Sequence, residues 1–342
     1  MVSIHSVLAN SPGILDLLHE FKEQVFKGHD IFTVAEANGV GPEELSQWVG
    51  EQGIFDMLFE FSHTTLEFPH GELWSQATGY VPEIIPRLKR VLADSQKATA
   101  KNGWYPIFFE NHDQMRCVRH YFPAEADKKL AAKGIAAILM TLRGTPFIYE
   151  GQELGLDNVA WGSIEDYNDI SSHGQYQLAL TEGRSVEEAM RLVHRYSRDS
   201  ARTPMQWSAE KNAGFTTGKP WLPVHGDYAV RCVESEASDE DSVLCFYRRL
   251  AALRGEGEAA KVLQQGNFSL ILEDDPHIFA FKRSFGRHTT YTMVNFTGEK
   301  QTYDLPELKG AKLLAGSVRN DRQGVLRPYE AAVYIKEAGE NA

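Results

Sequence analysis

Residues 106–113, with the sequence PIFFENHD, decide the fold class, because a short apolar run ends there in a cluster of polar side chains. Two other apolar runs have the same form: residues 31–36 end on Glu36, and residues 146–150 end on Glu150. Strands of a parallel sheet that is buried on both faces are nearly continuous apolar runs. In barrel enzymes, catalytic groups project from the carboxyl ends of such strands. The three runs therefore predict a buried parallel sheet whose strand ends carry a functional site.

Helical patterns alternate with these runs, and residues 54–59 form a fourth strand-like run. Apolar side chains recur at helical spacing in four segments: 11–28, 42–49, 83–92 and 128–142. This alternation predicts an α/β fold with a parallel sheet. A barrel is favoured over a doubly wound sheet because polar groups follow the strand ends. We therefore expect a partial TIM (β/α)8 barrel made of its last four βα units.

The character of the sequence changes towards the carboxyl end. Residues 151–221 predict long loops interrupted by one helix at 186–197, and residues 239–254 predict a last helix of the barrel. Four short strand-like runs separated by turn residues follow: 268–272, 278–282, 290–295 and 331–335. They predict a small antiparallel β domain. We place the barrel half at residues 1–256 and the β domain at residues 257–342.

Composition argues against several classes of function. The chain has 342 residues and a net charge of -12, and it lacks a basic run that would follow a nucleic-acid backbone. Its three cysteines are too few for a disulfide framework, and no Cys/His cluster has the spacing of a zinc site. Neither a membrane-length apolar stretch nor a signal-peptide pattern is present. We therefore expect a cytoplasmic protein with a small neutral ligand and no metal, nucleic-acid or membrane partner.

Two carboxylates and two arginines are the candidates for chemistry. Glu36 ends an apolar run, where desolvation favours a protonated carboxyl group suited to general acid catalysis; a salt-bridged glutamate is the plain alternative. Asp113 follows His112, and such a pair can hold a polyhydroxylated ligand by charge-assisted hydrogen bonds. Arg198 and Arg202 are four residues apart, a spacing that can place them on one helical face, but for this segment alone a helix end with surface ion pairs is the favoured interpretation.

Four motifs occur together: TVAEANGV at 33–40, FENHDQ at 109–114, GTPFIYEGQE at 144–153 and RDSARTPMQW at 198–207. In order and spacing they resemble the oligo-1,6-glucosidase, dextran glucosidase and α-glucosidase branch of the α-amylase superfamily, glycoside hydrolase family 13. The resemblance spans essentially the whole chain. It implies a retaining, exo-acting glycoside hydrolase for short α-1,4 or α-1,6 glucosides, without a cofactor. Any calcium site of the family would lie in its amino-terminal part, outside this chain.

The resemblance also implies a role for each matching residue. Glu36 matches the general acid/base, and Asp113 matches the aspartate that stabilises the oxocarbenium-like transition state. His112 and Arg198 match residues that bind the glucosyl unit in the innermost subsite. Two further pocket positions are matched by Asn38, on the leaving-group side, and Arg202.

Retaining chemistry needs in addition a nucleophilic aspartate about 5 to 5.5 Å from the acid. The family carries it in a Gly-Phe-Arg-x-Asp segment on the preceding strand, and these 342 residues contain no such segment. We therefore expect no independent activity, because the acid has no intermediate to act upon. A barrel reduced to four strands would expose two strand edges and its interior. We expect the chain either to pair with a separate amino-terminal half or to be poorly soluble.

The sequence departs from the family pattern at two places and leaves two alternatives open. Met115 stands where proline is usual, and Ile170 and Ser171 follow Asp169 where an acidic residue is common. A sucrose isomerase-like transglycosylase is one alternative, although its charged loop is not evident at residues 114–119. A non-catalytic barrel scaffold is the other, disfavoured by the retained site residues and the lack of a membrane segment.

Overall fold

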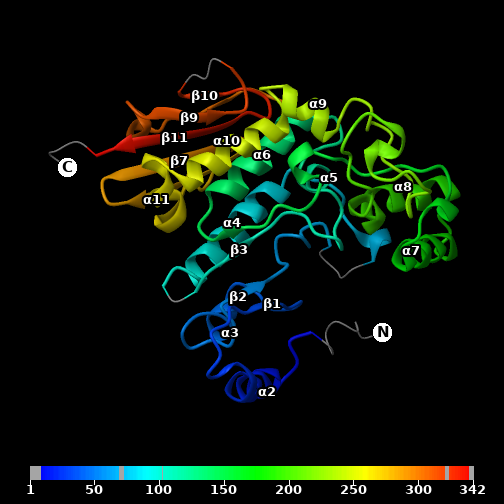
Figure 1. Ribbon diagram of the computed structural model, residues 1–342, viewed down its shortest axis with the longest axis horizontal. Helices are drawn as coiled ribbons and strands as arrows, with labels where there is room; N and C mark the ends of the chain where they lie inside the picture. The colour runs from blue at the N-terminus through cyan, green and yellow to red at the C-terminus, as the bar shows by residue number, and fades with distance from the viewer. Residues whose placement is uncertain (1–8, 69–72, 102, 320–322, 339–342) are drawn as a thin grey trace.

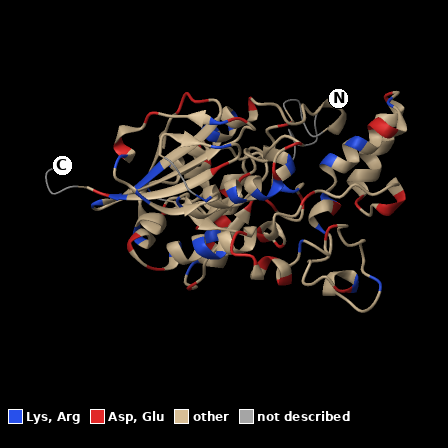
Figure 2. Ribbon diagram, turned by 90° about the horizontal axis from the view of Figure 1, so that it is seen from above, with Lys and Arg blue, Asp and Glu red and all other residues tan. Residues whose placement is uncertain are grey.

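A computed structural model describes residues 9–68, 73–101, 103–319 and 323–338. Its first strands and helices lie at one edge, long helices cross the middle, and a five-stranded antiparallel sheet lies at the opposite edge (Figure 1). Acidic and basic positions are interspersed along the ribbon (Figure 2). In the described part of the chain, no helix is both long and apolar enough to span a membrane.

The four expected strands form two parallel pairs. β1 (Val34–Glu36) pairs with β2 (Met57–Phe59), and β3 (Pro106–Ile107) pairs with β4 (Thr145–Pro146). Each strand is shorter than the apolar run that predicted it. β3 and β4 each contain a proline, which has no amide hydrogen and limits the ladder. The structure therefore confirms the α/β character and places Glu36 at the end of its strand.

Aromatic rings join the two strand pairs. Phe59, the last residue of β2, packs edge-on against Phe108 and Phe147, with ring centroids 5.2 Å and 4.8 Å away. These two rings directly follow β3 and β4. Because both rings contact Phe59, the carboxyl ends of β2, β3 and β4 lie close together, and the polar segments continue from there.

The amino-terminal helices are less buried than their apolar patterns suggest. The helix predicted over residues 11–28 is α2 (Ile14–Phe21), followed by a π-helical turn (Lys22–Phe26), and neither has a buried residue. α3 (Leu45–Trp48) is shorter than predicted but buries Leu45 and Trp48 beside β1 and β2.

Three long helices form the middle layer: α4 (Ile84–Ala98), α6 (Lys128–Thr141) and α10 (Val243–Gly255). α6 begins at Asp127, whose side chain accepts a hydrogen bond from the Leu130 amide at 3.0 Å. It then buries every residue from Ala131 to Thr141, including Lys133, whose Nζ donates to Oδ1 of Asp241 at 2.7 Å. α6 contacts both α10 and the antiparallel sheet, so it forms the centre of the core.

The predicted antiparallel sheet is present. Its strand order is β5 (Asn267–Ile271), β6 (Ile278–Phe285), β7 (His288–Asn295), β11 (Ala331–Glu337) and β9 (Lys312–Gly316). Sequence analysis missed β9, the short pair β8 (Gln301–Thr302) and β10 (Val325–Leu326), and the helix α11 (Glu258–Gln265). One face of the sheet packs on α6 and α11, so Phe279, Phe281 and Val294 belong to the same core as the long helices.

The segment 151–221 corrects one prediction. Only a helix at 186–197 was expected there, yet α7 (Ile170–Thr181) precedes α8 (Val186–Tyr196) and packs against it. α7 has weak local signals, since serines and Gly174 favour other conformations and the apolar residues form no clear stripe. Its first turn is fixed by Asp169, whose carboxylate accepts from the Ser171 amide at 3.3 Å. Two further short helices are α5 (Cys117–Tyr121) and α9 (Val233–Ser238).

Candidate active site

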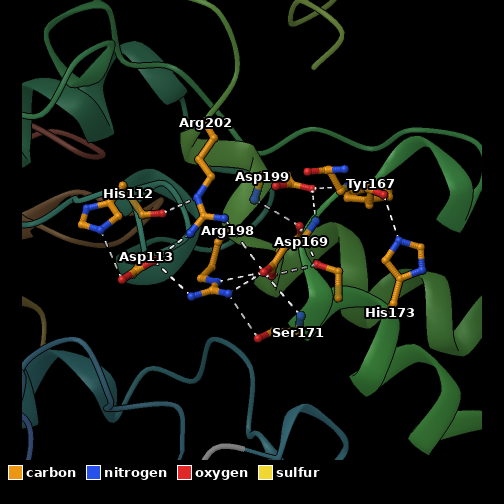
Figure 3. A network of polar contacts seen from close by, with 12 residues as sticks. His112, Asp113, Tyr167, Asp169, Ser171, His173, Arg198, Asp199 and Arg202 are labelled. Carbon is orange, nitrogen blue, oxygen red and sulfur yellow. Dashed lines mark hydrogen bonds and ion pairs between the residues drawn. The ribbon is translucent and has the colours of Figure 1, made fainter. Parts of the chain in front are cut away.

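Asp113 lies at the centre of a network of polar contacts beyond the end of β3 (Figure 3). Its backbone amide donates to Oδ1 of Asn111 at 2.8 Å, which fixes the turn. Its Oδ1 accepts from Nη1 of Arg198 at 3.1 Å and from Nη2 of Arg202 at 2.7 Å. Nε2 of His112 lies 3.4 Å from Oδ2. The structure therefore brings together four of the six site residues predicted from the sequence.

The two arginines come from one short segment. Arg198 begins a 3-10 helix (Arg198–Ala201) capped by Ser197, and Arg202 follows directly after it. Nε of Arg202 donates to the carbonyl oxygen of His112 at 2.8 Å. Arg198 thus holds the Asn-His-Asp turn through the carboxylate of Asp113. Arg202 holds it through the same carboxylate and also through the backbone carbonyl of His112. The plain alternative of surface ion pairs does not describe this arrangement.

Sequence analysis did not place Asp169 in the site, yet its carboxylate supports both arginines. Oδ1 of Asp169 accepts from Nη2 of Arg198 at 2.5 Å and from Nε at 3.2 Å, and Nη1 of Arg202 lies 3.9 Å away. Burial would raise the pKa of Asp169, but the hydrogen bonds and charge of Arg198 outweigh that effect and lower it. The hydrogen bond from Arg198 to Asp169 raises the pKa of Arg198 in turn.

Asp199 fixes the backbone that carries Asp169. Its Oδ2 accepts from the amides of Asn168 and Asp169 at 2.6 Å and 2.9 Å, and the residue is fully buried. Asp199 and Arg198 are adjacent, and both contact Asp169, Asp199 through the backbone amide and Arg198 through the carboxylate (Figure 3). The position of Asp199 inside the RDSARTPMQW motif was the signal that could have identified it; Asp169 had no comparable signal.

Glu36 and Asn38 reach the site from the end of β1. A cavity of about 290 Å³ is lined by Glu36, Asn38, Asp113 and Arg198 together. His112 lines an adjoining cavity of about 240 Å³ that also contains Glu36. Glu36 is exposed, so the prediction of a desolvated carboxyl group is wrong for this structure. The physical reason is that β1 pairs with a strand on one side only within the described residues.

The two departures from the family pattern have visible consequences. Met115 is buried in the cavity wall, in a cluster that includes Trp74 and Tyr196. Ser171 accepts a hydrogen bond from Nη2 of Arg198 at 3.4 Å, whereas Ile170 points outward and is 82% exposed. Ser171 therefore contributes a neutral hydroxyl group where an acidic side chain would add charge.

Metal-binding groups can be assessed only for the part of the chain that the structure describes. There, no three His, Cys, Asp or Glu side chains come together in a way that could hold an ion.

Residues 2–266 match the family model described as "Alpha amylase, catalytic domain". The chain belongs to the α-amylase family. Among its relatives in that family, probable oligo-1,6-glucosidase 3 of Bacillus subtilis is 38% identical over 334 residues, which are 95% of this chain and 58% of the relative. Trehalose-6-phosphate hydrolase of the same organism is 34% identical, over 96% of this chain and 59% of the relative. The resemblance to the oligo-1,6-glucosidase branch is thereby confirmed.

Solved structures of α-amylase family members agree with this assignment. Trehalose-6-phosphate hydrolase of Bacillus licheniformis has a TM-score of 0.86 and 31% identity, covering 97% of this chain and 60% of that structure. A trehalulose synthase mutant has a TM-score of 0.86 and 30% identity, covering 96% and 59%. The chain therefore spans about three fifths of the length of these family members.

Proposed function

We propose that this chain carries the acid/base part of a retaining α-glucosidase site that acts on short α-1,4 or α-1,6 glucosides. One observation carries the proposal: Glu36 and Asp113, far apart in the sequence, line the same cavity as Arg198. Glycoside hydrolysis uses carboxylates that converge on one sugar site, and these two supply the acid/base and the transition-state group of such a site but not its nucleophile. The relatives named oligo-1,6-glucosidase support the same reaction class.

Each residue has a defined part in this proposal. Glu36 protonates the leaving oxygen in the first step and removes a proton from water in the second. Asp113, held by two guanidinium groups, faces the anomeric centre and stabilises its positive charge in the transition state. His112 and Arg198 bind hydroxyl groups of the glucosyl unit. Two outer contacts are assigned to Asn38, on the leaving-group side, and Arg202.

The nucleophile must come from elsewhere in a complete site. Among the described residues that line the 290 Å³ cavity, the carboxylates are Glu36 and Asp113. We propose that β1 to β4 are the last four strands of a (β/α)8 barrel and that the family's amino-terminal part supplies the third carboxylate. Without that part, no covalent glucosyl intermediate forms, and the chain alone is inactive.

The surface around β1 supports a partner at this place. Its outer edge is unpaired in the described structure, and the side chains of Ile31, Phe32 and Val34 are exposed beside it. A groove of about 440 Å³ between α2 and β1 is lined mainly by apolar residues, among them Ile14 and Leu18. A free strand edge next to an apolar groove favours addition of another strand and helix.

Complementation tests the proposal. Hydrolysis of an aryl α-glucoside is measured for the chain by itself and for the chain mixed with the separately expressed amino-terminal part of probable oligo-1,6-glucosidase 3 of Bacillus subtilis. We expect hydrolysis in the mixture only, and a loss of at least about 100-fold for Glu36→Gln. The exposed Glu165→Gln serves as the matched control with unchanged activity. Hydrolysis by the chain alone would contradict the proposal that it lacks a nucleophile. A complex that forms without hydrolysis would overturn the proposed glucosidase activity.

A second candidate is transfer of the glucosyl group to another sugar, favoured by the similarity to trehalulose synthase structures. Sucrose supplied to the same mixture distinguishes the two reactions: glucose and fructose indicate hydrolysis, whereas an isomer of sucrose indicates transfer. A non-catalytic scaffold would show neither turnover nor sugar binding.

A further inference from the structure

Arg116 lies among the loops that carry the site, yet the proposed function gives it no chemical role. The residue is 1% exposed and directly precedes α5. We infer that Arg116 is a positioning residue, which fixes the turn that carries Asp113 relative to the segment of residues 198–202. This inference rests on the proposed function, because it explains how the carboxylate and the two arginines of that site are held at their distances.

The guanidinium group of Arg116 contacts three separate segments, which follow β3, β4 and α8. Its Nη1 atom donates to Oε2 of Glu110 and to the carbonyl oxygen of Glu150, both at 2.8 Å. Its Nε atom donates to the carbonyl oxygen of Ser200 at 3.2 Å, and its Nη2 atom donates to that of Ala201 at 3.5 Å. One side chain therefore joins the ends of β3 and β4 to the 3-10 helix of the two arginines.

The ion pair between Glu110 and Arg116 closes the Asn-His-Asp turn. The side chains of both residues are 1% exposed. The second oxygen of Glu110, Oε1, accepts from the backbone amide of Cys117 at 2.9 Å. Glu110 stands directly before residues 111–113, whereas Arg116 and Cys117 follow them. The turn therefore cannot shift relative to Arg116 without breaking a buried hydrogen bond between charged groups, which is among the costlier contacts to lose.

Asn158 holds the backbone of Arg116. Its Oδ1 atom accepts from the Arg116 amide at 3.0 Å, and its Nδ2 atom donates to the carbonyl oxygens of His194 and Arg195 at 3.2 Å and 2.6 Å. These carbonyl oxygens belong to the last turn of α8, which ends just before residues 198–202. Arg116 is therefore tied to the segment from both sides, through Asn158 to the helix before it and through its own guanidinium group to the 3-10 helix.

A purely structural role for Arg116 would be to neutralise the buried charge of Glu110. Lysine could supply that charge, but its ammonium group is compact and cannot also reach carbonyl oxygens on two other segments. The planar fork of arginine donates in several fixed directions, and here those directions lead to three segments. The contacts therefore indicate placement of the segments in addition to charge balance, and substitution by lysine separates the two roles.

Native-state hydrogen exchange of the full-length chain tests the inference without a substrate. The amides of residues 113–114 and of Ser200 and Arg202 are hydrogen-bonded within their own segments. In Arg116→Lys we expect these amides to exchange roughly tenfold faster, as the loss of one hydrogen bond to a charged group would cause, while exchange in the β domain stays unchanged.

Arg283→Lys is the matched control. Arg283 is also fully buried and also donates to backbone carbonyl oxygens, but it lies between α6 and β6. Its substitution should leave exchange at residues 113–114 and 200–202 unchanged. If Arg116→Lys does not fold, Asn158→Ala decides by the same measurement: Asn158 is uncharged and half-buried, so its loss leaves no unpaired buried charge and should still speed exchange in both segments.

Turnover in the mixture with the amino-terminal part gives a second readout. Arg116→Lys should lower kcat at least about tenfold with little change in KM, because Asp113 acts on the charge that develops in the transition state. Arg283→Lys should keep the kcat of the unmodified chain.

Two results would overturn the inference. Unchanged exchange in both segments of Arg116→Lys would mean that a positive charge beside Glu110 is sufficient. Faster exchange by the same factor throughout the chain would make Arg116 a residue of general stability. Absence of turnover in the mixture with the unmodified chain would instead overturn the proposed function, and the exchange measurement would still decide whether Arg116 fixes the two segments.

Discussion

The Nη2 atom of Arg198 lies 2.5 Å from Oδ1 of Asp169, while Nη1 of the same guanidinium donates to Oδ1 of Asp113 at 3.1 Å. The Asp169 side chain is 1% exposed, whereas that of Arg198 is 30% exposed. Asp169 is therefore the fixed member of the pair, and Arg198 projects from it towards Asp113. The position of the Asp113 carboxylate thus depends, through Arg198, on a residue that is not part of the described cavity lining.

Asp169→Asn tests this dependence. The substitution keeps the shape of the side chain but removes the charge that orients Arg198, so we expect maltose binding to weaken by about tenfold. The ion pair is buried only at Asp169, so its loss should lower the free energy of unfolding measured with urea by about 1.5 to 3 kcal/mol. Asp94→Asn, in the exposed pair with Lys97, is the control and should change that free energy by less than about 0.5 kcal/mol. Unchanged sugar binding by Asp169→Asn would show that Arg198 is held by Asp113 alone.

The sequence predicted those parts of the molecule that depend on local pattern. The apolar runs ending on Glu36 and Asp113 located strand ends, and the helix at 128–142 matched α6 because its composition and cap signal agree. α7 and the role of Asp169 were missed because both depend on contacts between distant segments. The exposure of Glu36 was mispredicted for a related reason: an apolar strand is buried only if another element covers it.

His120 makes stability depend on pH. It is buried on α5, its ring stacks on Tyr121 with centroids 4.3 Å apart, and its Nε2 atom has no hydrogen-bond partner among the described residues. Burial, with the charge of Arg195 and the nearby His63, lowers the pKa of His120 to about 3. The unfolded chain takes up this proton near pH 6.5, and the folded chain does not, so stability falls as pH decreases from about 6.5 towards 3.

His120→Phe should reduce this pH dependence. Phenylalanine keeps the ring stack and cannot take up a proton, so the loss of unfolding free energy between pH 7.5 and 5.5 should be smaller by about 1.4 kcal/mol. Urea denaturation at the two pH values measures the difference. His29, which is exposed, provides the control substitution His29→Phe with no comparable change. Equal pH dependence of His120→Phe and the unmodified chain would mean that His120 is protonated in the folded state.

The exposed apolar residues at the amino-terminal edge should make the isolated chain self-associate. Leu17, Phe21 and Phe32 are 64%, 47% and 64% exposed, and they lie on α2 and beside β1. We expect Phe21→Ser combined with Phe32→Ser to lower association, measured by size-exclusion chromatography with light scattering. The control replaces Val186 and Val230, which are exposed elsewhere, with serine. A stable monomer of the unmodified chain without a partner would contradict the proposed docking surface.

Gly144 lies between α6 and β4, and we expect that no side chain is tolerated at this position. Its φ is +135°, and an added Cβ would lie 2.0 Å from the carbonyl oxygen of Tyr105, which accepts the Thr145 amide at 2.9 Å. Gly183, with φ +85° and open space around it, is the matched control, since alanine there costs only about 1 to 2 kcal/mol of backbone strain. Gly144→Ala must also displace the Tyr105 carbonyl and the β3–β4 pairing, so we expect a loss above about 4 kcal/mol by urea denaturation. Because β3 leads into the turn that carries Asp113, the same variant should lose maltose binding under conditions where it remains folded, whereas Gly183→Ala should keep it. Equal stability of the two variants would mean that the β3–β4 connection can shift without effect on the fold.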